Sequence, residues 1–203
     1  MENLIEPYST KVNIHSFMHA CNRASIFYNC FQHLEEGNAL FKEQKFKKAI
    51  STYGKSLAYT RGLPGSKRGL DNIASMAVSE SGPKTSPEQE ARSIEIEGVV
   101  ETNIAMCFVK LAEPRKAIEH ADKALSLNKN SWKAYLRKGE AQILMMNSDG
   151  AKASLDSAWS NAPDAAAQTM ITKERKKLSS LEKEETKKQK AAWAGIFNKE
   201  SKA

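Results

Sequence analysis

Residues 98–129 read GVVETNIAMCFVKLAEPRKAIEHADKALSLNK, and residues 132–163 read WKAYLRKGEAQILMMNSDGAKASLDSAWSNAP. The offset between the two stretches is 34 residues (132−98). Their small residues stay in register, at Ala105 and Gly139, Ala117 and Ala151, and Ala124 and Ala158. A period of 34 residues is that of a helix–turn–helix repeat, which cannot bury its apolar face alone and stacks on its neighbours. The sequence therefore predicts an all-α helical solenoid, whose functional surface we expect to be a groove.

A third copy of the pattern lies upstream. Its landmarks have the spacing of those in the last repeat, with Gly37, Ala49, Tyr53 and Ser56 standing where Gly139, Ala151, Leu155 and Ala158 stand. Small residues at such points let paired helices approach closely, while large residues fill the gaps between layers. We expect three repeats, at about residues 30–63, 98–131 and 132–163.

A long insertion separates the first two repeats. Their equivalent residues are 68 apart (105−37) rather than 34, which leaves residues 64–97 as extra chain. Residues 62–89 are rich in Gly, Pro, Ser and Lys, a composition typical of loops. A helix is expected to resume at Pro87, because Ser86 suits a cap and proline suits the first helical position. Residues 1–29 are predicted to be a partly helical N-terminal extension.

The complete pattern predicts seven helices. We expect them at about residues 25–44, 46–61, 87–110, 114–127, 131–146, 149–161 and 164–198. The last helix would cap the solenoid by covering the apolar side of the third repeat, and residues 164–203 would form this helix and a basic tail. Its predicted buried stripe consists of Ala166, Met170, Leu178 and Leu181.

The composition indicates one globular domain with a charged tail. The 203 residues are 40% hydrophobic and 27% charged, with a net charge of +7. Residues 173–202 hold ten Lys or Arg and five acids, so +5 of this charge lies in the tail. No membrane span, signal peptide or specific nucleic-acid motif is recognised. We expect a cytoplasmic protein, with the nucleus as a second location, and reduced thiols at Cys21, Cys30 and Cys107.

The sequence offers no enzyme site. His15 and His19 are four residues apart, but no Cys or acidic residue nearby completes a metal site. No serine or cysteine constellation accompanies His120. The segment GLPGSKRG at residues 62–69 lacks the spacing of a phosphate loop. We expect a non-catalytic protein with no cofactor and no metal.

The period and landmarks of residues 30–163 resemble those of tetratricopeptide repeat (TPR) proteins. This resemblance implies that the first helix of each repeat lines a concave groove, which would bring together Asn38, Asn103, Lys133 and Arg137. Lys133 and Arg137 are four residues apart and share one helical face. Arg offers a planar fork, Lys a point charge and Asn an amide, so the set suits a carboxylate ligand.

This set also resembles the carboxylate clamp of heat-shock cochaperones and large immunophilins, which bind the C-terminal Glu-Glu-Val-Asp tails of the 70 and 90 kDa heat-shock chaperones. The resemblance implies five clamp positions, of which Asn38, Asn103, Lys133 and Arg137 match four. Leu34 stands where the family has its first Lys. Lys42, one turn after Asn38, is expected to compensate for it in part.

The similarity to large immunophilins extends beyond the clamp. The order of repeat, insertion, two repeats and a long charged helix resembles their C-terminal half, without their isomerase domain. The helix ends in Trp193, Ile196 and Phe197, which would either contact a client or complex subunit or pack back on the repeats.

Three functional hypotheses follow. The first is a cochaperone adaptor that binds the acidic C-terminal tail of a heat-shock chaperone through an incomplete clamp. The second is a TPR scaffold that assembles a complex through another peptide or helix, with Leu34 marking an apolar groove. The third is a binder of membrane or nucleic acid through the basic tail, which requires strongly salt-dependent binding.

Overall fold

The structure is a computed structural model that describes residues 24–61 and 86–200, with side chains at residues 27–61, 86–191 and 193. These ranges contain seven helices and no strand. The helices are α2 (Ala24–Lys42), α3 (Phe46–Arg61), α4 (Pro87–Lys110), α5 (Pro114–Leu127), α6 (Trp132–Leu144), α7 (Ser148–Ser160) and α8 (Ala165–Glu200). Their bounds agree with the predicted ones to within two residues at each end.

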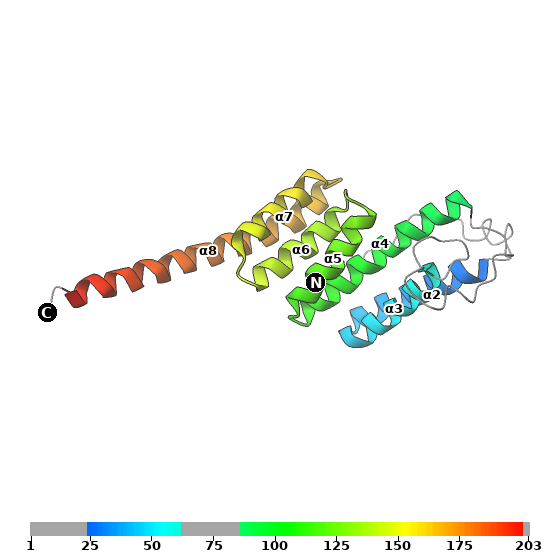
Figure 1. Ribbon diagram of the computed structural model, residues 1–203, viewed down its shortest axis with the longest axis horizontal. Coiled ribbons are helices and arrows are strands. Elements are labelled where there is room, and N and C mark those ends of the chain that lie inside the picture. Colours follow the sequence, from blue (N-terminus) through cyan, green and yellow to red (C-terminus); the bar gives the residue numbers. More distant parts are fainter. Residues whose placement is uncertain (1–23, 62–85, 201–203) are drawn as a thin grey trace.

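The helices form three hairpins that lie side by side. The pairs are α2 with α3, α4 with α5, and α6 with α7, while α8 packs against α7 and α6 and then continues beyond the repeats (Figure 1). This arrangement confirms the predicted all-α solenoid of three repeats with a long C-terminal helix. Residues 1–23 and 62–85, which hold most of the predicted extension and insertion, lie outside the described residues, so the domain boundaries stay predictions.

Side-chain caps fix where α4, α6 and α7 begin. The Ser86 hydroxyl accepts a hydrogen bond from the Gln89 amide at 3.2 Å, and the Ser86 amide donates to Gln89 Oε1 at 3.1 Å. This reciprocal capping box starts α4 one residue after Ser86, as the sequence predicted. Ser131 caps α6 and Asn147 caps α7 through a single bond each, in which the side-chain oxygen accepts from the backbone amide of Ala134 or Gly150.

In the first and third repeats, close contact between the two helices depends on glycine. A Cβ added to Gly37 would lie 2.6 Å from Cδ1 of Tyr53, and one added to Gly139 would lie 2.9 Å from Cδ2 of Leu155. Both distances are far below van der Waals contact, so each large side chain of the second helix packs directly on the backbone of the first. In the first repeat Tyr53 is completely buried, with 0% of its surface exposed.

The buried stripe of α8 differs from the predicted one. Ala167, Ile171, Glu174 and Leu178 are buried, whereas the predicted Ala166 is exposed. Met170 and Leu181 are partly buried at the edge of the contact with α6 and α7. The prediction was wrong at Ala166 because the buried side chains follow the spacing i, i+4, i+7 and i+11 from Ala167, and this phase is set by packing against α7.

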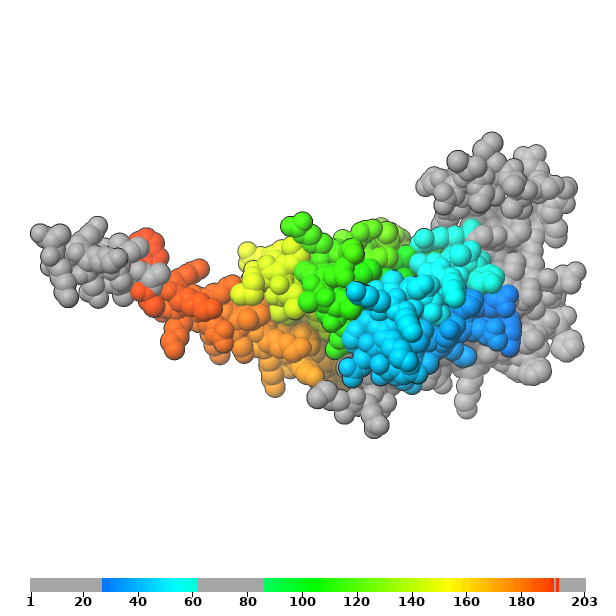
Figure 2. All heavy atoms as spheres, turned by 90° about the horizontal axis from the view of Figure 1, so that it is seen from below, coloured from blue at the N-terminus to red at the C-terminus, as the bar shows by residue number. Residues whose placement is uncertain are grey.

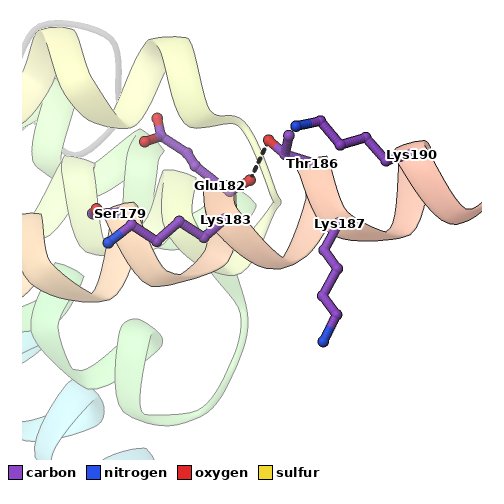
Figure 3. A pocket seen from close by; sticks show the side chains of 6 residues that line it. All are labelled: Ser179, Glu182, Lys183, Thr186, Lys187 and Lys190. Carbon is purple, nitrogen blue, oxygen red and sulfur yellow. Dashed lines mark hydrogen bonds between the residues drawn. The ribbon is translucent and has the colours of Figure 1, made fainter.

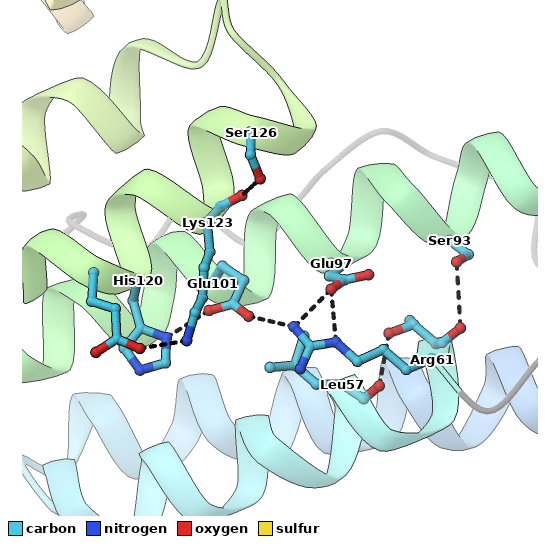
Figure 4. Close-up of polar contacts among 10 residues, drawn as sticks. Leu57, Arg61, Ser93, Glu97, Glu101, His120, Lys123 and Ser126 are labelled. Atoms are coloured by element: carbon cyan, nitrogen blue, oxygen red, sulfur yellow. Dashed lines mark hydrogen bonds and ion pairs between the residues drawn. The ribbon is translucent and has the colours of Figure 1, made fainter. Parts of the chain in front are cut away.

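A network of charged residues joins the first repeat to the second. Arg61, the last residue of α3, bonds Glu97 and Glu101 of α4 at 2.7–2.8 Å, and Glu101 also bonds Nδ1 of His120 in α5 at 2.6 Å. Figure 4 shows Arg61 reaching from its helix to both glutamates. Burial opposes the charge of Arg61, but the hydrogen bonds and charges of Glu97 and Glu101 outweigh it and raise the pKa of the guanidinium. Three helices therefore share one set of polar contacts.

We predict that Arg61→Ala lowers the free energy of unfolding by about 2 kcal/mol, because Glu101, which is 1% exposed, loses its cation. Urea denaturation at neutral pH measures this change. The matched control is Lys123→Ala, which removes an exposed ion pair with Glu119 on α5 and should cost about 0.5 kcal/mol or less. Equal losses in the two variants would mean that the network does not stabilise the fold.

Cys30 and Cys107 are buried free thiols, and burial raises the pKa of both, that of Cys107 to about 12. In a Cys21→Ser variant we predict that iodoacetamide labels neither thiol in the native protein at pH 8.5 and both in urea, as measured by mass spectrometry. The pKa of each thiol is higher in the folded protein than in the unfolded one. The free energy of unfolding is therefore at its full value below the unfolded pKa and falls as the pH rises above it. Rapid labelling of the native protein would contradict this prediction.

Candidate functional site

A groove runs along the first helices of the three repeats. It has a volume of about 520 Å³ and is lined by α2, α4, the C-terminal end of α5, the turn after α5, and α6. Five of the six predicted site residues line it: Leu34 and Asn38 from α2, Asn103 from α4, and Lys133 and Arg137 from α6. Residues far apart in the sequence thus meet in one place, as the stacking of repeats requires.

The two predicted asparagines are in direct contact. Asn103 Nδ2 donates to Asn38 Oδ1 at 3.2 Å, and the Tyr53 hydroxyl donates to the same oxygen at 2.7 Å. An amide oxygen has two lone pairs, so both acceptor positions of Asn38 are occupied within the protein. The Nδ2 group of Asn38 carries the hydrogen-bonding capacity that remains for a ligand.

Arg137 is held by a carboxylate of its own helix. The residue is only 4% exposed, and its Nη1 donates to both carboxylate oxygens of Glu140 at 2.8 Å. Within the described part of the chain these bonds engage Nη1 alone, which leaves the donors on Nε and Nη2 for another partner. Glu140 therefore positions the guanidinium and also offsets its charge.

Lys133 is the exposed cation of the groove. Its Nζ lies 5.6 Å from the centroid of the Trp132 ring, in a cation–π contact. Two acids, Glu35 and Glu95, line the groove as well. The lining charges of Lys133 and Arg137 are therefore matched in number by those of these two glutamates, and the groove is not a strongly cationic surface.

Leu34 lines the groove, whereas Lys42 does not. Leu34 is 5% exposed, belongs to the core of the first two repeats and forms part of the groove wall. Lys42 is the last residue of α2, is exposed, and is not among the groove-lining residues. Its contribution to ligand binding stays a prediction.

The sequence prediction missed three features of this groove. The hydroxyl of Tyr53 reaches Asn38 from the second helix of the repeat, fifteen residues away, and no local pattern signals such a contact. Glu140 follows Arg137 by three residues, a spacing at which helical side chains meet, and this spacing could have revealed the pair. Apolar residues of α4, among them Ile94 and Val99, line the groove between its polar parts.

A second hollow lies along α8. All six of its lining side chains, including Lys183, Lys187 and Lys190, come from this one helix and point in different directions around it (Figure 3). A single helix gives no opposing wall, so this hollow cannot enclose a ligand as the groove can. Trp193 is 62% exposed on the same helix, and the side chains of Ile196 and Phe197 lie outside the described ones. No helix among the described residues is long and apolar enough to cross a membrane.

No protein-family model matches the chain. Two curated relatives are peptidyl-prolyl cis-trans isomerases. FKBP42 of Arabidopsis thaliana is 28% identical over 162 residues, or 80% of this chain, and FKBP4 of Bos taurus is 29% identical over 168 residues, or 81% of it. The chain spans 39% and 31% of the lengths of these two relatives.

Several solved structures share the fold. The Hsp90 co-chaperone Cns1 of Saccharomyces cerevisiae matches with a TM-score of 0.56 and 22% identity, over 88% of this chain and 47% of that one. The C-terminal TPR-containing domain of an FK506-binding protein of Plasmodium falciparum gives 0.55 and 24%, over 82% and 99%. The second TPR domain of human RPAP3 gives 0.50 and 19%, over 74% and 98%. In fold, then, the chain is a TPR solenoid that resembles the TPR regions of chaperone cochaperones and of FKBP-type immunophilins.

Proposed function

We propose that this chain is a non-catalytic adaptor whose groove binds the acidic C-terminal tail of a heat-shock chaperone of the 70 or 90 kDa class. The observation that carries the proposal is the convergence of Asn38, Asn103, Lys133 and Arg137 on one groove. Amide and cationic donors from three different helices suit a carboxylate, and a peptide end carries one on its main chain.

The known proteins of this fold support the same ligand class. The second TPR domain of human RPAP3 was solved in complex with an HSP70 peptide, SGPTIEEVD, and Cns1 is an Hsp90 co-chaperone. The RPAP3 peptide comes from a heat-shock chaperone and ends in Asp, and the partner of Cns1 is a heat-shock chaperone as well. The exposed Trp193 on α8 gives the adaptor a second surface for a client or complex subunit.

The clamp in this chain is incomplete. Leu34 supplies no charge at the position of the first clamp Lys, and Lys42 lies outside the groove lining. A charge-assisted hydrogen bond contributes about 1.5–3 kcal/mol, so its absence lowers the affinity by about tenfold to a hundredfold. We therefore expect micromolar rather than nanomolar binding.

Calorimetric titration with the peptide Met-Glu-Glu-Val-Asp tests the proposal, beside the same peptide amidated at its C-terminus. We predict micromolar binding of the acid, no measurable binding of the amide, and a loss of about tenfold or more in Lys133→Ala and Arg137→Ala, since each removes a donor to the carboxylate. Lys133 is exposed, so its variant tests binding without a cost to folding.

The control for this titration is Lys42→Ala, which removes an exposed cation of α2 outside the groove lining. It should bind like the wild type. Circular dichroism checks that Arg137→Ala is folded, because that variant leaves the half-buried Glu140 without its partner. An unchanged affinity in both groove variants would refute the clamp.

One observation favours a second candidate function. The buried, apolar Leu34 and the neighbouring α4 residues Ile94 and Val99 give the groove a wall that suits an apolar side chain. A TPR scaffold that assembles a complex through a different peptide or helix, independent of chaperones, would use this wall rather than the cations. The two functions make opposite predictions for Leu34.

We predict that Leu34→Lys tightens binding of the acidic peptide by about tenfold, because its long stem stays against the core while the ammonium reaches the groove. Leu34→Met, which keeps an apolar side chain of similar volume, is the matched control and should leave the affinity unchanged. Thermal melting confirms that both variants fold. Weaker or unchanged binding by Leu34→Lys would favour the scaffold.

A further inference from the structure

Tyr53 connects the core of the first repeat to the groove. Tyr53 belongs to α3, and its completely buried ring packs on Gly37 of α2, where no Cβ would fit. Because the ring lies against bare backbone, its hydroxyl extends past α2 far enough to bond the side chain of the next residue, Asn38. A residue of the second helix thereby acts on a surface formed by the first helices.

The hydrogen bonds around Asn38 fix which end of its amide is presented to the groove. The two ends of an Asn amide have nearly the same shape, so hydrogen bonds decide their orientation. Here the Tyr53 hydroxyl at 2.7 Å and Asn103 Nδ2 at 3.2 Å both donate to Oδ1. The flipped amide would set its NH₂ group against the NH₂ group of Asn103, which cannot accept its hydrogens, and would require the Tyr53 hydroxyl to turn and accept instead of donate.

We infer that Tyr53 is a positioning residue of the peptide site: by donating to Asn38 Oδ1 it holds the Nδ2 hydrogens of Asn38 toward the ligand as carboxylate donors. This inference rests on the proposed function. An inverted Asn38 would present an oxygen lone pair to the carboxylate and repel it. The preference of the groove for an anion would therefore depend on the buried Tyr53 hydroxyl as well as on Lys133 and Arg137.

The hydroxyl is suited to this task throughout the physiological range. Burial raises the pKa of Tyr53, so the group stays protonated and remains a donor. Tyr53→Phe removes only this donor and keeps the ring that packs on Gly37. The substitution thus separates the polar role of Tyr53 from its part in the core.

The experiment is a double-mutant cycle with Tyr53→Phe, Asn38→Ala and the double variant, titrated with the acid and amidated forms of Met-Glu-Glu-Val-Asp. We expect Tyr53→Phe to weaken binding of the acid about fivefold to tenfold, and the double variant to bind no worse than Asn38→Ala alone, because Tyr53 acts through Asn38. Tyr59→Phe is the matched control. This half-buried tyrosine of α3 stacks on His33, is not among the groove-lining residues and should bind like the wild type.

A second readout needs no ligand. In ¹⁵N-labelled peptide-free protein, the side-chain amide signals of Asn38 should be sharp in the wild type and in Tyr59→Phe, and broadened or shifted in Tyr53→Phe. Wild-type affinity in Tyr53→Phe, or additive losses in the cycle, would overturn the inference. If the wild type itself fails to bind at millimolar peptide, the proposed function fails, and unchanged Asn38 signals in Tyr53→Phe would separately overturn the positioning of Asn38.

Discussion

The structure depends on the close approach of the two helices within each repeat. At Gly37 and Gly139 a side chain of the second helix occupies the space that a Cβ would need, so the helices pack backbone against side chain. This spacing sets the stacking of the hairpins and, through it, the groove. In the first repeat it has a chemical consequence, because the same contact that packs Tyr53 brings its hydroxyl to Asn38. Core packing and the polarity of the groove are therefore two results of one glycine.

Charged residues have different roles in two parts of the fold. Between the first and second repeats, three helices are joined by Arg61, Glu97, Glu101 and His120 (Figure 4). These contacts are directional, whereas purely apolar contacts are not. In the groove, Glu140 holds Arg137 from within one helix. The first set fixes how two repeats are placed, whereas the second fixes one side chain that faces the groove. Neither set is exposed enough to be screened completely by salt.

The sequence was sufficient to predict the helices, since they follow from a 34-residue period and from caps such as Ser86 that act over three residues. It was also sufficient to gather Asn38, Asn103, Lys133 and Arg137 in one groove, because equivalent positions of stacked repeats lie side by side. It failed where tertiary packing decides. The phase of α8 about its axis is set by contact with α7, so Ala167 rather than Ala166 is buried. The bond from Tyr53 to Asn38 joins two helices that are separate in the sequence, so no local pattern reveals it.

The second half of α8 has a mechanical consequence. Its side chains from Glu182 to Ala191 are exposed except for the half-buried Glu185, and the helix projects from the body of the molecule (Figure 2). The first half of α8 packs on the repeats through Ile171 and Leu178, and this packing stabilises the helix nucleus. Each further residue then only extends an existing helix, which is less costly than nucleation. The 19 residues from Glu182 to Glu200 (200−181) span about 28 Å at 1.5 Å per residue. A flexible linker of that length would allow a molecule bound at its end to lie at many distances from the groove. A continuous helix instead sets one distance and one direction. Two molecules bound at the two ends of this helix would contact each other only if its fixed length and direction bring them together.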